Sequence, residues 1–135
     1  MNTTLKNSIG LVLGIILGGL ANMAIIQLSD FFISPPAGVD PSDIESIKAN
    51  IHLYKVKHFI FPFLAHALGT LVGALVALKI ASKHHFTFTL AIAGFFFLGG
   101  LSMVFMLPTP TWFIITDLGL AYFPMGLLAY KLTRK

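Results

Sequence analysis

A long apolar run that contains a single charge constrains this chain more than any other feature. From Phe86 to Tyr130 the only formally charged side chain is Asp117. A helix needs about 20 apolar residues to cross the hydrocarbon core of a bilayer, so this run is long enough for two crossings. The run predicts an integral membrane protein with a carboxylate inside one of its membrane-spanning helices.

The same length criterion predicts four spanning helices, at about residues 8–30, 59–80, 86–107 and 112–130. We therefore expect an all-α fold, a four-transmembrane-helix bundle that forms one integral membrane domain over residues 1–135. Pro124 is expected to kink the last helix because proline removes a backbone hydrogen bond. A cleaved signal peptide is the alternative for the first helix, but its apolar run is longer than a usual signal sequence and no small-residue cleavage site follows it.

Composition excludes several classes of function. Only 10% of the residues are charged, against about 25% in ordinary soluble domains. The chain has no cysteine, which excludes disulfides, thiolate nucleophiles and zinc ribbons. The formal net charge is +4, but the basic residues are spread over short loops and ends, so no nucleic-acid partner is expected. No catalytic motif, metal site or cofactor-binding motif is recognisable.

The distribution of basic residues predicts the orientation in the membrane. Cytoplasmic loops carry an excess of lysine and arginine, and with the N-terminus inside the bias falls on the cytoplasmic side. Both termini are therefore predicted in the cytoplasm. The cytoplasmic group is Lys6, Lys79, Lys83, Lys131, Arg134 and Lys135, and the outer group is Lys48, Lys55 and Lys57.

The outer loop, residues 34–57, is the one substantial polar segment. Asp40 followed by Pro41 is typical of a helix start. An apolar stripe follows, with polar residues on the other faces, and predicts a short amphipathic helix. This helix acts either as a lid over the bundle or as a connector that buries its stripe. The stripe consists of Ile44, Ile47, Ile51 and Tyr54.

Small residues recur every four positions on the first two predicted helices. Helices in lipid associate through close packing, and small residues let their backbones approach. The pattern predicts tight helix contacts, either within one chain or between copies of it. The packing residues are Gly10, Gly14 and Gly18 on the first helix and Gly69 and Gly73 on the second.

Four polar residues lie inside the predicted spans: Asn22, His66, Ser102 and Asp117. Counted from the outer ends of their helices at 1.5 Å per residue, they sit at a similar depth, roughly 8–12 Å below the outer interface. We predict a polar centre for a ligand or a proton, built on an Asp117–His66 pair and open toward the outer side.

Two interpretations of these residues stay open. Ionisable groups inside membrane helices are rare and usually functional, since a charge there costs about 2.5–3.5 kcal/mol on insertion scales. Polar residues also hold helices together through hydrogen bonds worth about 0.6–2 kcal/mol. The first interpretation is favoured for Asp117 and His66, and the second for Asn22 and Ser102.

Three functions follow from these interpretations. The first is a small transporter or conduit, in which a second copy helps to line the path. The second is a structural or accessory protein that binds a partner membrane protein or lipid through its glycine-rich faces. The third and least favoured is an intramembrane enzyme, for which Ser102, His66 and Asp117 have the residue types of a catalytic triad but no recognisable geometry. The expected partners are the lipid bilayer and either a second copy or another membrane protein.

Three segments carry a resemblance to known proteins: SPPAGVD at 34–40, HFIFPFLAHALGTLVG at 58–73 and FMLPTPTWF at 105–113. Together they resemble an uncharacterised family of small four-helix bacterial integral membrane proteins. The resemblance covers nearly the whole chain and implies the fold and a bacterial inner membrane, but no activity. Small multidrug-resistance transporters are similar in size and helix number, yet they carry an essential glutamate in the first span, where this chain has no acidic residue before Asp30.

Overall fold

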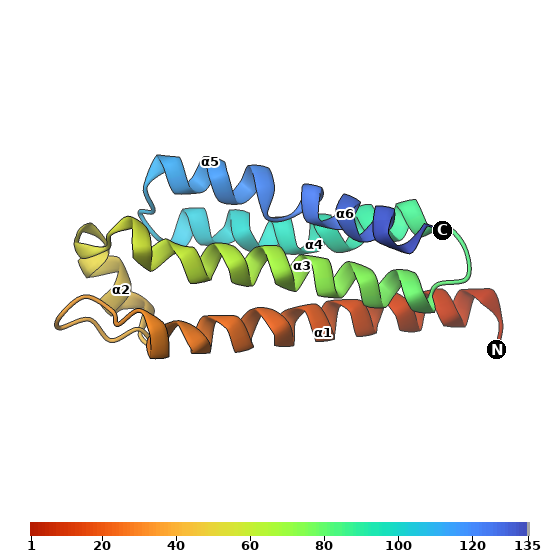
Figure 1. The fold of residues 1–135 in the computed structure, drawn as a ribbon, viewed down its shortest axis with the longest axis horizontal. Helices are drawn as coiled ribbons and strands as arrows, with labels where there is room; N and C mark the ends of the chain where they lie inside the picture. The colour runs from red at the N-terminus through yellow and green to blue at the C-terminus, as the bar shows by residue number, and fades with distance from the viewer. Residues whose placement is uncertain (135) are drawn as a thin grey trace.

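The computed structural model describes residues 1–134, which form a bundle of helices without a strand in that range (Figure 1). The all-α fold is therefore confirmed. Lys135, predicted on the cytoplasmic side, lies outside the described residues. The helices are α1 (Thr3–Phe32), α2 (Ile44–Asn50), α3 (Ile60–Ile80), α4 (His85–Met106), α5 (Thr111–Leu120) and α6 (Phe123–Thr133), with short 3-10 turns at Ile51–Leu53 and Val56–Phe59.

Four helical segments are long and apolar enough to cross a membrane: Thr3–Phe32, Val56–Ile80, His85–Met106 and Thr111–Thr133. They match the four predicted spans. The first segment is longer than predicted at both ends. The second gains a 3-10 turn at its start, and the fourth is divided between α5 and α6. The four segments run along the long axis of the bundle (Figure 1).

The bundle buries small residues and exposes large ones. Its fully buried positions include Ala65, Ala74, Ala77, Ala93 and Ala129. Large apolar side chains such as those of Leu20, Phe31, Leu98, Phe105 and Ile115 are mostly exposed. Soluble proteins rarely expose apolar surface on this scale. The arrangement is the one expected of helices whose outer faces meet lipid and whose backbones pack closely.

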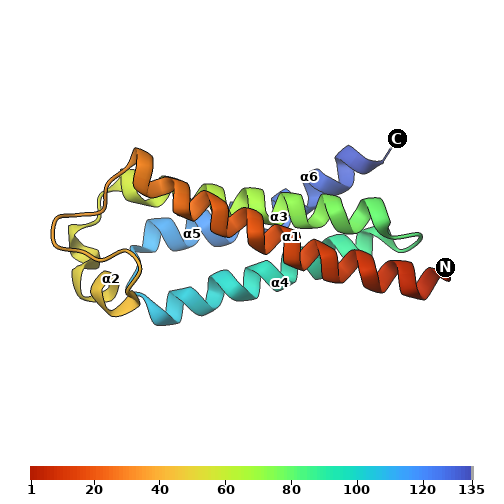
Figure 2. The same ribbon diagram turned by 90° about the horizontal axis from the view of Figure 1, so that it is seen from below.

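Helices α1 and α3 pack through their glycines within one chain. A Cβ added to Gly14 would lie 2.6 Å from the carbonyl oxygen of Gly73, and one added to Gly18 would lie 2.6 Å from that of Gly69. Gly10 continues the contact, since a Cβ added there would lie 3.0 Å from the carbonyl oxygen of Ala77. The two stripes therefore meet each other, and Figure 2 shows α1 crossing α3 along its length.

The last span is broken where a kink is predicted. Helix α5 ends at Leu120 and α6 begins at Phe123, with Pro124 in its first turn. Proline has no N–H to continue the α5 hydrogen-bond ladder. Tyr122 lies at the break with φ −115° and ψ −79°, outside the ordinary helical range. The break turns α5 away from α3, whereas α6 lies closer to it (Figure 1).

The outer-loop helix begins later than its sequence suggests. The N-cap of α2 is Asp43, whose side chain accepts a hydrogen bond from the N–H of Glu45 at 3.0 Å. The Asp40 carboxylate instead accepts from the backbone N–H and the hydroxyl of Ser42, at 2.9 and 2.6 Å. The Ser42 hydrogen bonds hold the pKa of Asp40 below its usual value. These hydrogen bonds form a turn that occupies the Asp40 carboxylate before α2 begins. The prediction that Asp40 caps the helix is therefore wrong.

The amphipathic character of α2 is confirmed. The apolar stripe of Ile44 and Ile47 is half-buried, whereas Glu45 and Lys48 on the other faces are exposed. The stripe continues through the 3-10 turn to Tyr54, which packs its ring against those of His58 and Phe59 at 5.3 and 6.1 Å. No residue of α2 is fully buried, so the choice between lid and connector stays open.

Candidate functional site

The predicted contact between the two intramembrane ionisable residues is present. Asp117 lies in the middle of α5 and His66 in the first half of α3. His66 Nδ1 lies 2.8 Å from Asp117 Oδ1. The Asp117 side chain is 6% exposed and that of His66 22%. A nearly buried carboxylate is thus joined to a half-buried imidazole across two helices that are far apart in sequence.

A third residue, Tyr122, completes this group and was missed from the sequence. Its hydroxyl donates to Asp117 Oδ2 at 2.9 Å, and its ring stacks on that of His66 with centroids 5.8 Å apart. Tyr122 is 1% exposed. The break between α5 and α6 places it so that it reaches back five residues to the carboxylate. We call Asp117, His66 and Tyr122 the carboxylate cluster.

Helix α4 holds Tyr122 in place from the other side. Gly100 lies directly against the Tyr122 hydroxyl, so that a Cβ at this position would overlap the phenolic oxygen. Phe97, one turn earlier, packs edge-on against the Tyr122 ring at 5.9 Å and 88°. The absence of a side chain at Gly100 is therefore the condition for the Tyr122–Asp117 hydrogen bond.

The hydrogen bonds satisfy the carboxylate and leave one ring nitrogen free. Each Asp117 oxygen has one donor, from His66 and from Tyr122, which offsets the cost of burying a charged group. With Asp117 ionised, Nδ1 carries the proton in this contact, so Nε2 is the remaining acceptor of a neutral ring or the second donor of a charged one. Among the described residues Nε2 has no hydrogen-bond partner. Every buried side-chain nitrogen or oxygen of those residues does have a partner, so Nε2 must be accessible from outside the bundle.

Ser102 and Asn22 do not join the carboxylate cluster. Ser102 is exposed, and its hydroxyl donates to the carbonyl oxygen of Gly99 at 2.7 Å. At 3.6 residues per turn, Ser102 lies on nearly the opposite face of α4 from Gly100. Asn22 is half-buried on α1, where its Cβ faces Gly69 in the contact with α3, and it makes no hydrogen bond to the cluster within residues 1–134. The structure therefore brings together two of the four predicted residues.

The Ser102, His66 and Asp117 residue types do not form a catalytic triad. In such a triad the serine hydroxyl is within hydrogen-bond reach of the imidazole. His66 Nδ1 faces Asp117, as it would in a triad. The Ser102 hydroxyl, however, is exposed and donates to the Gly99 carbonyl oxygen of its own helix instead of to the imidazole. The intramembrane-enzyme hypothesis therefore loses Ser102, its candidate nucleophile.

Replacing Tyr122 by phenylalanine removes one donor from the buried carboxylate and keeps the ring stack. We expect a loss of about 1 kcal/mol of unfolding free energy, the range found for hydrogen bonds between membrane helices. Tyr130→Phe is the matched control, because Tyr130 lies in α6, the helix that follows Tyr122, and its hydroxyl has no hydrogen-bond partner among the described residues. Thermal unfolding of both variants in detergent measures the difference, and equal midpoints would contradict the role assigned to the Tyr122 hydroxyl.

Comparison with known proteins gives no further guide to this site. No protein-family model matches the sequence, and neither a curated protein nor a solved structure matches the chain. The function must therefore be argued from the carboxylate cluster and from the four apolar segments that surround it.

Proposed function

We propose that this chain is a small multi-pass membrane transporter that takes up and releases a proton at the carboxylate cluster. One observation carries the proposal: a buried carboxylate is hydrogen-bonded at 2.8 Å to an imidazole, inside helices that are long and apolar enough to cross a membrane. Both side chains exchange protons, and ionisable residues in such helices usually mark a pathway for ions or protons.

The cluster has the parts that proton exchange requires. His66 Nε2 is free to accept a proton from outside the cluster or to donate one to it, while Nδ1 stays bonded to Asp117. A proton gained at Nε2 makes the imidazole cationic and pairs it with the carboxylate. The Tyr122 hydroxyl holds the second carboxylate oxygen throughout. Because Nδ1 is bonded to Asp117 and Nε2 is open, protons would enter and leave the cluster through Nε2.

We further propose a bacterial inner membrane with both termini in the cytoplasm. The two ends of the described chain and the turn between α3 and α4 lie at one end of the bundle, and the loop that carries α2 lies at the other (Figure 1). The first end holds Lys6, Lys79, Lys83, Lys131 and Arg134. Because basic residues accumulate on the cytoplasmic side, this arrangement supports the predicted orientation.

A transport path is proposed to need a second copy of the chain. Two surface grooves, of about 300 and about 200 Å³, are lined by residues of α1 and by residues of α3 and α5. Neither groove is lined by Asp117 or His66. Small membrane proteins form their binding sites between repeats or copies, so a homo-oligomer is the arrangement in which the open side of His66 would meet a path.

The alternative is a structural or accessory protein that binds a partner membrane protein or lipid through its glycine-rich faces. The glycines that suggested it pack against each other: Gly14 against Gly73 and Gly18 against Gly69. They are therefore occupied within the chain and offer no free face. A partner protein or lipid would instead have to use open positions such as Gly94 and Gly99, where an added Cβ meets nothing within 4 Å. A second form of this alternative is that the carboxylate cluster is only a structural link between α3, α5 and Tyr122 at the start of α6.

Asp117→Asn separates the two functions. Asparagine keeps the size of the side chain and its hydrogen-bonding capacity but does not exchange a proton near neutral pH. We expect proton flux to fall at least tenfold in vesicles containing the full chain, with a melting temperature close to that of the parent. Flux is followed with a trapped pH-sensitive dye after a membrane potential is imposed. Asp30→Asn is the control, since Asp30 is exposed at the end of α1.

The outcomes distinguish transport from a structural link. Parent vesicles that carry no more protons than empty vesicles, or an Asp117→Asn variant that carries as many as the parent, would sink the transport proposal. A variant that loses flux only because it no longer folds would favour the structural link. Loss of flux in Asp117→Asn alone, with folding and oligomeric state retained, supports the proposal.

A further inference from the structure

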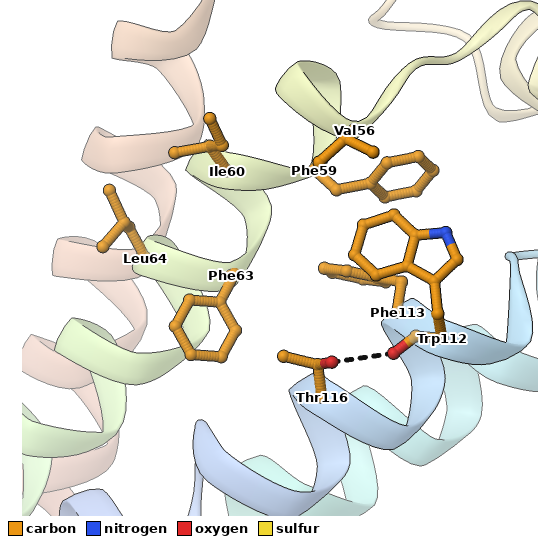
Figure 3. A pocket seen from close by; sticks show the side chains of 8 residues that line it. All are labelled: Val56, Phe59, Ile60, Phe63, Leu64, Trp112, Phe113 and Thr116. Atoms are coloured by element: carbon orange, nitrogen blue, oxygen red, sulfur yellow. Dashed lines mark hydrogen bonds between the residues drawn. The ribbon is translucent and has the colours of Figure 1, made fainter.

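An apolar groove runs between α3 and α5 at the end of the bundle that carries α2. Its volume is about 200 Å³. Ile60, Phe63 and Leu64 line it from α3, and Trp112 and Thr116 line it from α5, as labelled in Figure 3. The Thr116 hydroxyl donates to the carbonyl oxygen of Trp112 at 2.8 Å, so the one polar side chain in the lining presents its methyl group rather than an unpaired donor.

Aromatic rings close the end of this groove next to the loop. Phe59 packs against Phe113 with centroids 4.8 Å apart and against Trp112 at 5.4 Å. Phe59 and Phe113 are buried, whereas Trp112 is 44% exposed. Indole rings favour the headgroup level of a bilayer. The groove thus starts at the depth where a lipid headgroup meets its acyl chains.

A basic pair flanks one of the groove-lining residues in the sequence. Val56 lines the groove, and its chain neighbours Lys55 and Lys57 are both exposed. The turn is fixed by the N–H of Lys55, which donates to His58 Nδ1 at 2.8 Å. Neither lysine forms an ion pair with another described residue. The one ion-pair contact among residues 1–134 is that between His66 and Asp117. Two exposed ammonium groups on either side of a groove-lining residue would complement an anionic headgroup whose acyl chain enters the groove.

We propose that this groove binds one anionic phospholipid, with its phosphate at Lys55 and Lys57 and an acyl chain between α3 and α5. A zwitterionic phospholipid offers the same acyl chain but no net charge to the lysine pair. A basic residue near an anionic lipid surface contributes about 1 kcal/mol, or roughly fivefold in affinity. The groove should therefore prefer an anionic lipid by about fivefold or more. The proposal does not depend on proton transport at the carboxylate cluster.

The chain carries its own reporter for this site. Trp112 is the only tryptophan in the sequence and lines the groove. Bromine atoms on an acyl chain quench indole fluorescence only at short range. We would reconstitute the full chain into phosphatidylcholine vesicles with a small, fixed fraction of brominated phosphatidylglycerol, or with the same fraction of brominated phosphatidylcholine. We expect the association constant obtained from quenching to be about fivefold or more higher for the anionic lipid.

Charge variants test whether the lysine pair sets this preference. The Lys55→Gln/Lys57→Gln variant should quench equally with both brominated lipids. The control, Lys79→Gln/Lys83→Gln, removes two exposed lysines at the opposite end of α3 and should keep the parent preference. Equal quenching of the parent by both lipids, or an anionic preference that survives in Lys55→Gln/Lys57→Gln, overturns the proposal. All four lysines are exposed, so neither variant is expected to impair folding.

Discussion

Gly100→Ala will destabilise the protein and disrupt the carboxylate cluster, whereas Gly99→Ala will not. A methyl group at Gly100 overlaps the Tyr122 hydroxyl, while one at Gly99 meets nothing within 4 Å. Tyr122 is 1% exposed, so its ring has no open space into which it can move. Overfilling a packed interior costs about 1–3 kcal/mol, and loss of the Tyr122–Asp117 hydrogen bond adds about 1 kcal/mol, as expected for Tyr122→Phe.

Gly99 is a matched control for Gly100 because it is the adjacent residue of the same helix. Alanine is a better helix former than glycine by about 1 kcal/mol at either position, so only the contact with Tyr122 distinguishes the two variants. Gly99→Ala should therefore leave the unfolding free energy unchanged or raise it slightly, while Gly100→Ala lowers it by about 2–4 kcal/mol. Thermal unfolding in detergent measures both variants, and proton flux in vesicles should fall only in Gly100→Ala. If the two variants unfold at the same temperature, Tyr122 does not occupy the position against α4 that the structure gives it.

The helices could be predicted from sequence because their cause is local. An uncharged apolar run of about 20 residues has few possible structures other than a membrane-spanning helix. The partnership of Asp117 with His66 was also predictable, because a charged group in an apolar span needs a partner and the chain offers few. Their hydrogen bond at 2.8 Å agrees with that expectation.

The rest of the carboxylate cluster depends on rotation about the helix axes, which the sequence does not reveal here. Ser102 was placed in the polar centre from its depth alone, but it faces outward on α4. That helix is apolar on every side, so no polar face marks its orientation. Tyr122 was missed because its contact arises only from the break before Pro124. A tyrosine two residues before a proline in an apolar span is the signal that was available.

Gly18→Leu is expected to separate α1 from α3, and Gly19→Leu to leave the bundle intact. A Cβ at Gly18 would lie 2.6 Å from the carbonyl oxygen of Gly69 and 2.7 Å from the Phe96 ring. Backbone cannot move aside as a flexible side chain does, so the helix itself must shift. Gly19, the next residue, has no neighbour within 4 Å of an added Cβ, and leucine there would extend into the surroundings.

We expect Gly18→Leu to lower the unfolding free energy by about 3 kcal/mol or more, at the upper end of the cost of overpacking, and Gly19→Leu to change it by less than about 1 kcal/mol. Thermal unfolding gives the energies, and size-exclusion chromatography of the same samples gives the oligomeric state. If Gly18→Leu instead leaves the unfolding temperature unchanged and dissociates an oligomer, the glycine stripes join copies of the chain. If it only unfolds earlier, Gly18 and Gly69 hold α1 to α3 within one chain, and the surfaces that join copies must be sought on the outward faces of the helices.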